Sequence, residues 1–140
     1  MNRRVRLLVA ASNTLIRRGL VSLLETEKNF RVIGQAEDGE EVLSLCPALF
    51  PDLAILDAGL FVKDGFQTAA ELKALSPELS IILLLDFGTR SELARAEALD
   101  PAAIVLKGTA ENDLLKAVQE VVQGRRYQSP DLRGALSKSK

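Results

Sequence analysis

The chain has 140 residues, a length typical of one domain that buries its own core. Its formal net charge of −1 gives no reason to expect direct binding to nucleic acid or to a membrane. Histidine is absent and Cys46 is the one cysteine, which excludes His-based nucleophiles, His-ligated metal sites and an intramolecular disulfide. No run of about 18 apolar residues occurs, and no signal-peptide core follows Met1–Arg4, so we expect a cytoplasmic protein.

Five short apolar runs alternate with helical patterns along the chain. The runs are apolar at successive positions, as in LAIL and IILLL, which is typical of parallel strands covered on both faces. We predict strands at Val5–Ala10, Arg31–Ala36, Asp52–Leu56, Ser80–Leu85 and Ala102–Leu106. Apolar residues at helical spacing predict helices around residues 15–24, 40–45, 66–75, 93–98 and 110–123. Five strand–helix repeats favour a doubly wound α/β fold, with a five-stranded parallel sheet and five helices on its two faces.

The two ends of the last predicted helix carry capping signals. Thr109 precedes this helix and is a favourable N-cap residue, and Gly124 follows it as a stop. The apolar period weakens after Gly124, and the segment contains five basic residues against the single acid Asp131. We therefore assign residues 1–124 to the folded domain and residues 125–140 to a basic tail or the start of a linker.

Two charged side chains stand where predicted strands end. Asp57 directly follows the third apolar run, and Lys107 directly follows the fifth. The carboxyl ends of parallel strands collect at one edge of an α/β sheet, where ligands and chemistry are found. Two interpretations fit this placement equally well: a reactive carboxylate with a cationic partner, or an ion pair that joins two loops. Glycine-rich phosphate-binding loops are absent from the sequence, which argues against nucleotide binding.

Ordered fragments that together cover residues 4 to about 132 carry a family resemblance. They are VRLLVAASNTLIRRGLVSLLE, VIGQAEDGEEVL, PDLAILD, IVLKGTAENDLLKAV and GRRYQSPDL. They resemble the receiver domain of two-component response regulators, in the branch whose receivers precede a LuxR-type (NarL/FixJ-like) helix-turn-helix. The resemblance implies the flavodoxin-like receiver fold with strand order 2-1-3-4-5. It also implies that Asp57 occupies the phosphoacceptor position and Lys107 the position of the lysine that contacts the phosphate.

The sequence departs from the family pattern around those two residues. Ala10 and Ala11 stand where the family places two acids that bind Mg²⁺. Leu85 replaces the Ser or Thr that ends the fourth strand, and Ile104 replaces the aromatic residue of the fifth. Mg²⁺ needs hard oxygen ligands and supplies much of the charge neutralisation in phosphoryl transfer. We therefore expect weak or absent Mg²⁺ binding, and no other cofactor.

These substitutions suggest the hypothesis of an atypical response regulator, a pseudo-receiver that works without Mg²⁺-dependent phosphorylation. Because the two acids are absent, Lys107 by itself is enough to neutralise Asp57. We expect this ion pair to hold the domain in one conformation without a signal. Such a domain is not an enzyme, and it regulates transcription by forming a homodimer or by docking a protein partner. It reaches DNA only through a C-terminal helix-turn-helix domain that these residues do not contain, and it has no membrane partner.

Two alternatives remain open at the level of sequence. The chain is a phosphorylatable receiver if Asp57 is used together with a metal site rebuilt on Asp86, or on Glu37 and Asp38. It is instead a small-molecule sensor if a ligand enters an apolar pocket at the sheet edge lined by Ala10, Ala11, Leu85 and Ile104.

Overall fold

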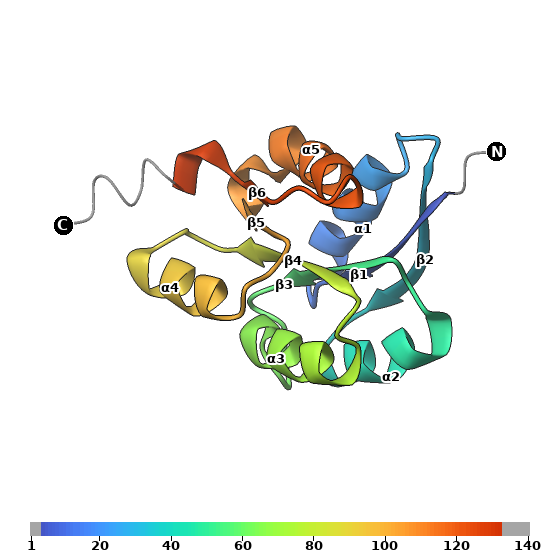
Figure 1. Cartoon of the computed structure of the whole chain (residues 1–140), viewed down its shortest axis with the longest axis horizontal. Coiled ribbons are helices and arrows are strands. Elements are labelled where there is room, and N and C mark those ends of the chain that lie inside the picture. Colours follow the sequence, from blue (N-terminus) through green and yellow to red (C-terminus); the bar gives the residue numbers. More distant parts are fainter. Residues whose placement is uncertain (1–3, 133–140) are drawn as a thin grey trace.

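A parallel sheet forms the middle layer of the fold, and helices cover both of its faces (Figure 1). The computed structural model describes residues 4–132. The strands are β1 (Val5–Ala10), β2 (Phe30–Ala36), β3 (Leu53–Asp57), β4 (Ser80–Leu85), β5 (Ala103–Leu106) and β6 (Tyr127–Gln128). The helices are α1 (Thr14–Leu24), α2 (Gly39–Leu49), α3 (Gly65–Leu75), α4 (Arg90–Ala98) and α5 (Ala110–Val122), with a 3₁₀ turn, η1 (Lys107–Thr109), before α5.

The strand order is β2-β1-β3-β4-β5-β6. This order confirms the predicted arrangement of the first five strands, but the prediction of a five-stranded sheet is wrong because β6 extends it. The sixth strand pairs in parallel with β5 through Tyr127 opposite Ala103. Two residues are too few for an apolar period to reveal a strand, and only contact with β5 defines this one. The folded part of the chain thus continues beyond Gly124 to the fully buried Leu132, and residues 133–140 of the predicted tail lie outside the described range.

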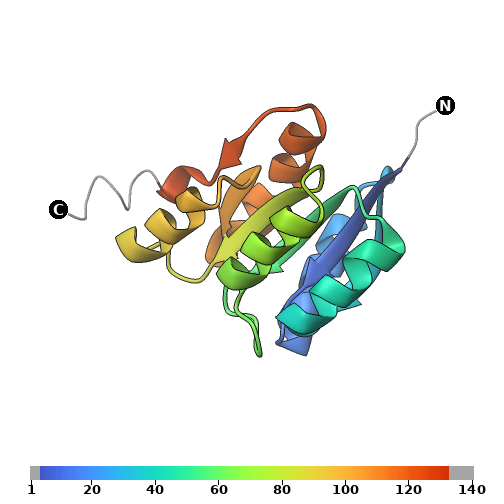
Figure 2. The ribbon, with the colours of Figure 1, turned by 60° about the horizontal axis from the view of Figure 1, so that its bottom comes forward.

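Each central strand contributes side chains to two separate cores. Leu56 of β3 packs with α2, α3 and α4 on one face, whereas the preceding Ile55 packs with α1 and α5 on the other. Figure 2 shows α2, α3 and α4 together in front of the sheet, with α1 and α5 behind it. Because successive residues point to opposite faces, a strand that is buried on both faces must be apolar throughout. This explains the continuous apolar runs of the sequence.

Side chains at the strand-to-helix turns start four of the helices. Asn13, Asp38, Asp64 and Thr89 each accept a hydrogen bond from a backbone N–H of the first helical turn. The predicted Thr109 cap is wrong, because η1 places this residue where its side chain accepts no such bond. Its hydroxyl donates instead to Asp113 Oδ2 at 2.6 Å.

Helix α2 is longer than predicted and runs through Pro47 to Leu49. Its free C-terminal carbonyls are satisfied by Arg6, which donates to Leu49 O at 2.8 Å and to Phe50 O at 2.6 Å. Phe50 then takes a left-handed conformation, with a φ of 51°, and ends the helix. Within residues 4–132, none of the helices is long and apolar enough to cross a membrane.

Candidate functional site

Asp57 and Lys107 meet at the carboxyl edge of the sheet, as the strand ends predict. Lys107 Nζ lies 3.1 Å from both carboxylate oxygens of Asp57. Asp57 is 4 % exposed, and its Oδ1 also accepts a hydrogen bond from Gly59 N at 2.8 Å. The carboxylate is therefore nearly enclosed, with one ammonium and one backbone N–H as its partners.

Asp86 is the third member of this cluster. It is the first polar residue after the apolar run of β4, and its Oδ1 forms an ion pair with Lys107 Nζ. Burial by itself lowers the pKa of Lys107, but hydrogen bonds to Asp86 and Asp57 outweigh it and the pKa is raised above its ordinary value. We call Lys107 with its two carboxylate partners, Asp57 and Asp86, the Lys107 clamp. Sequence reasoning treated Asp86 as a possible metal ligand and missed this contact, although the strand-end rule that found Asp57 also applies to it.

Ala10 and Ala11 lie at the end of β1, next to the clamp. Ala10 is in register with Leu56, so Ala11 follows at the level of Asp57 on the neighbouring strand. Both alanines are fully buried. Where the receiver pattern has two acids, the side chains of Ala10 and Ala11 offer no oxygen ligand for Mg²⁺. Residues 4–132 contain no group of three or more acidic or cysteine side chains placed to hold a metal ion.

Arg17 of α1 also reaches this edge. It is 9 % exposed, and its guanidinium donates to Ala11 O at 2.7 Å and to Gln35 Oε1 at 3.3 Å. It also lies 3.6 Å from Glu37 Oε1. Arg17 therefore ties the end of β1 to the end of β2. The sequence did not reveal this contact, because an arginine on an amphipathic helix normally faces solvent.

The remaining predicted site residues lie apart from the clamp or have other partners. Glu37 pairs with Arg17, and Asp38 caps α2 by accepting from Glu41 N. Leu85 is fully buried and Ile104 is 6 % exposed, in the core cluster that also contains Ala10. Ala11 belongs to the cluster on the opposite face of the sheet. The four apolar positions therefore do not line one common pocket.

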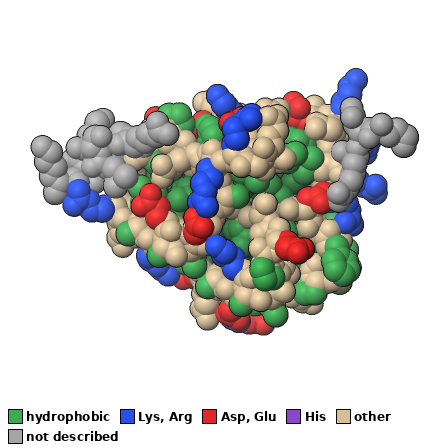
Figure 3. Space-filling view, in the orientation of Figure 1, with side chains coloured by type: hydrophobic (Ala, Val, Ile, Leu, Met, Phe, Trp, Pro, Cys, Tyr) green, Lys and Arg blue, Asp and Glu red, His purple; other side chains and the backbone are tan. Residues whose placement is uncertain are grey.

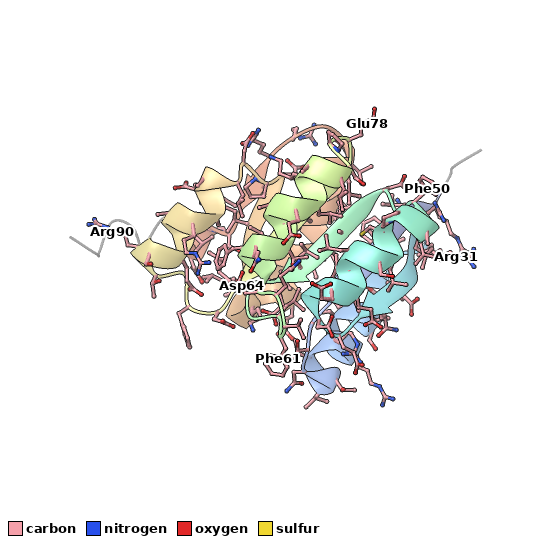
Figure 4. The ribbon with its side chains drawn as sticks, turned by 90° about the horizontal axis from the view of Figure 1, so that it is seen from below. Arg31, Phe50, Phe61, Asp64, Glu78 and Arg90 are labelled. Carbon is pink, nitrogen blue, oxygen red and sulfur yellow. The ribbon has the colours of Figure 1, made fainter. Side chains whose placement is uncertain are left out.

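The loop between β3 and α3 closes over the edge beside Asp57. Phe61 N donates to Ser12 Oγ at 2.9 Å, and Ser12 Oγ donates to Glu37 O at 2.5 Å, which joins three strand-end loops. Phe61 and Val62 themselves are 69 % and 78 % exposed, and Val62 has a φ of 68°, which is unfavourable for a β-branched residue. Figure 4 shows Phe61 at the tip of this loop, close to the start of α1 and apart from Phe50.

Charges elsewhere on the surface are mixed in sign. In the face of Figure 3, Lys and Arg side chains lie beside acidic ones around small apolar hollows. Arg125 pairs with Glu120 at 3.0 Å, and Arg126 pairs with Asp100. These contacts neutralise the two arginines of the predicted basic tail that fall within the described residues. The face in view therefore presents no extended patch of one charge.

Comparisons with known proteins identify the family and the fold of the chain. The model of the response regulator receiver domain matches residues 7–119. The uncharacterized transcriptional regulatory protein YvfU of Bacillus subtilis is 34 % identical over 128 residues, which are 91 % of this chain and 64 % of that protein. The isolated receiver domain of RcsB from Salmonella enterica, solved with the phosphomimetic BeF₃⁻, has a TM-score of 0.88 at 25 % identity, covering 95 % of this chain and 99 % of that one.

A structure of two RcsB dimers bound to two parallel DNAs is also similar, with a TM-score of 0.90 at 26 % identity. It covers 99 % of this chain and 70 % of the other. This chain spans 64 % of the length of YvfU, so the family match concerns the receiver part of such regulators. The chain belongs to the response regulator receiver domain family.

Proposed function

We propose that this receiver domain regulates transcription through protein contacts, without Mg²⁺-dependent phosphorylation and without enzymatic activity. The observation that supports the proposal most directly is the Lys107 clamp. One ammonium group pairs with both carboxylates, Asp57 and Asp86, in a site whose β1 end carries two alanines. The chain itself therefore supplies a cation at the place where a bound metal ion would lie, and this ammonium offsets one of the two carboxylate charges.

Two features of the site oppose phosphorylation: the burial of Asp57 and the alanines at the end of β1. A phosphoryl donor needs an accessible carboxylate oxygen, and the Asp57 side chain is only 6 % exposed. Metal ions balance the charge that develops during phosphoryl transfer, and here Ala10 and Ala11 offer no oxygen ligands in place of the two acids. Leu85 and Ile104 also lack the hydroxyl and the aromatic ring that the receiver pattern uses to report a phosphate.

A second copy or another regulatory protein is the partner that we propose. The related RcsB was solved as two dimers bound to two parallel DNAs, which supports a second copy of the chain as the partner. DNA would then be reached through a helix-turn-helix domain that residues 4–132 do not include. Sedimentation of the chain over a range of concentrations tests the self-partner directly, and a monomer at all concentrations would leave a different protein as the partner.

Titration with Mg²⁺ and BeF₃⁻ tests the phosphorylation-independent function. We expect the amide spectrum of the wild-type chain to stay unchanged, because BeF₃⁻ needs both a metal ion and the Asp57 carboxylate. Ala11→Asp is the matched variant, checked for folding by circular dichroism, since it returns a carboxylate beside Asp57 and should gain binding. Stoichiometric binding by the wild-type chain, with shifted amides around Asp57, would overturn the proposal.

A phosphorylatable site that uses Asp86 is the second candidate. One observation favours it: a Cβ built on Gly59 would lie 3.4 Å from Asp86 Oδ2 and 3.5 Å from Asp57 Oδ1, so both carboxylates approach the same glycine. Such a site requires Lys107 to leave Asp86. The same titration separates the two candidates, because Asp86→Asn would abolish any metal-dependent BeF₃⁻ binding that this site supports.

A further inference from the structure

The segment after α5 contacts residues close in sequence to Lys107 and the loop that carries Asp86. We name residues 125–132 the C-terminal strap, and we propose that its docking is coupled to the clamp, so that opening the clamp releases the strap. The inference deepens the proposed function and rests on it for the role of Lys107. Three independent contacts carry it.

Ser129 makes the first contact, at β5. It is fully buried, its Oγ accepts a hydrogen bond from Leu106 N at 3.1 Å, and its own N–H donates to Ile104 O at 3.0 Å. Leu106 directly precedes Lys107 in the chain. The strap thus continues the hydrogen-bond ladder of β5 up to the residue before the clamp lysine. A displacement of the Lys107 backbone therefore alters a buried hydrogen bond to the strap.

Leu132 makes the second contact, below the β4–α4 loop. Its side chain is fully buried, and a Cβ added at Gly88 would lie 2.6 Å from Leu132 Cδ2 and 2.7 Å from Leu106 Cδ2. Gly88, which has a φ of 67°, follows Asp86 by two residues. The loop that carries Asp86 therefore rests directly on the end of the strap, and the close approach leaves no room for a side chain at Gly88.

Tyr127 makes the third contact, at the start of α5. Its hydroxyl donates to Asp113 Oδ1 at 3.2 Å, and Thr109 donates to Oδ2 of the same carboxylate. Thr109 ends the η1 turn that begins at Lys107. The strap is consequently linked to the clamp lysine from its C-terminal side as well as from β5.

The three contacts support the loops of both Asp86 and Lys107, and few residues of the strap make them. Strand β6 has two residues, and a cavity of about 370 Å³ opens beside it between β5, the end of α4 and Arg126. Elements with few buried contacts open at low free-energy cost. A charge change at the clamp would therefore set how firmly residues 125–132 dock on the domain.

Limited trypsin digestion with mass spectrometry tests this coupling, because Arg125 and Arg126 lie at the start of the strap. Asp86→Asn removes one charge from the clamp and leaves the pair of Lys107 with Asp57 in place. Asp64→Asn is the matched control: Asp64 also pairs with a cation, Arg95, and asparagine retains its role as the cap of α3. Cleavage after Lys116, within α5, reports global unfolding.

We expect Asp86→Asn to raise cleavage after Arg126 at least threefold relative to cleavage after Lys116, and Asp64→Asn to leave this ratio unchanged. Leu132→Ala should conversely accelerate hydrogen exchange at the Leu106 amide. The coupling would be overturned if Asp86→Asn showed the wild-type ratio of cleavage after Arg126 to cleavage after Lys116, and if Leu132→Ala left hydrogen exchange at the Leu106 amide unchanged. The outcome is distinguishable from a failure of the proposed function, which the Mg²⁺ and BeF₃⁻ titration decides with a separate readout.

Discussion

Replacing Lys107 by methionine removes the central cation of the clamp while keeping most of the side-chain volume. The Asp57 side chain, 6 % exposed, would then be left with Gly59 N–H as its remaining described partner. Removing one member of a fully buried ion pair costs about 3–5 kcal/mol, and exposed pairs contribute about 0–1 kcal/mol. Lys107 and Asp86 are 22 % and 34 % exposed, so we expect a loss of about 3 kcal/mol in the free energy of unfolding.

Urea unfolding followed by circular dichroism measures this loss. With an m-value of about 1.5 kcal/mol/M, the midpoint should fall by about 2 M. Lys116→Met, at an exposed position of α5, should stay within about 0.5 kcal/mol of the wild type. The double variant Lys107→Met/Asp57→Asn should recover at least half of the loss, because it no longer buries an unpaired charge. A midpoint shift no larger than that of Lys116→Met, with no recovery in the double variant, would refute the assigned role of the clamp.

The clamp also predicts a pH dependence of stability. The pKa of Lys107 is raised in the folded state, so its contribution is fully present below the ordinary value of 10.5 and is lost as pH rises through the folded pKa. The difference in unfolding free energy between wild type and Lys107→Met should therefore be constant from pH 7 to 9 and should narrow above about pH 10.5. If the difference in unfolding free energy between wild type and Lys107→Met grew at high pH, the stabilising role of the Lys107 ion pairs would be contradicted.

Three further predictions concern the scaffold around the site. Burial raises the pKa of Cys46 from 9.0 to about 11, so the thiol ionises at lower pH in the unfolded chain, and about 2–3 kcal/mol of stability should be lost between pH 9 and 11. The urea midpoint should therefore fall less steeply with pH in Cys46→Ala than in the wild type, and equal slopes would refute this. Gly65→Ala should cost more than about 3 kcal/mol, because its Cβ would lie 2.3 Å from Asp57 O, and a fully folded, stable variant would contradict that contact. Gly19→Ala should instead stabilise by about 0.5–1 kcal/mol in the same assay, since nothing lies within 4 Å of its Cβ inside α1, and a loss of stability would count against the open space.

The first five strands and the meeting of Asp57 with Lys107 were predictable from local features of the sequence, whereas the order of those strands was implied by the family resemblance. Strands β3 and β5 are apolar at consecutive positions, and Asp57 and Lys107 follow these runs directly. Parallel strands align their carboxyl ends, so the two side chains had to share one edge. Lys107 Nζ lies 3.1 Å from Asp57 Oδ1, a contact that both interpretations of the two strand ends require.

The features that were missed depend on contacts between distant segments. Strand β6 forms because Tyr127 and Gln128 pair with the edge strand β5. Leu132 is buried next to Gly88, which has no side chain to occupy that space. Arg17 resembles a solvent-exposed helix residue in the sequence, and its burial follows from the carbonyl of Ala11 and the amide of Gln35. Thr109 is a residue type that favours the N-cap position, but the η1 turn directs its hydroxyl to Asp113. Periodicity and capping preferences depend on residues that are neighbours along the chain. They therefore do not predict contacts between segments that are distant in the sequence.

Phosphorylation of Asp57 itself is the most direct measurement of the central claim. The wild-type chain and Ala11→Asp would be incubated with acetyl phosphate and Mg²⁺, and the intact mass of each would be followed over time, with Asp57→Asn as the background. We expect the wild-type chain to remain at its unmodified mass, indistinguishable from Asp57→Asn. Accumulation of one phosphoryl group on the wild-type chain, and its absence in Asp57→Asn, would contradict the claim that this receiver works without Mg²⁺-dependent phosphorylation.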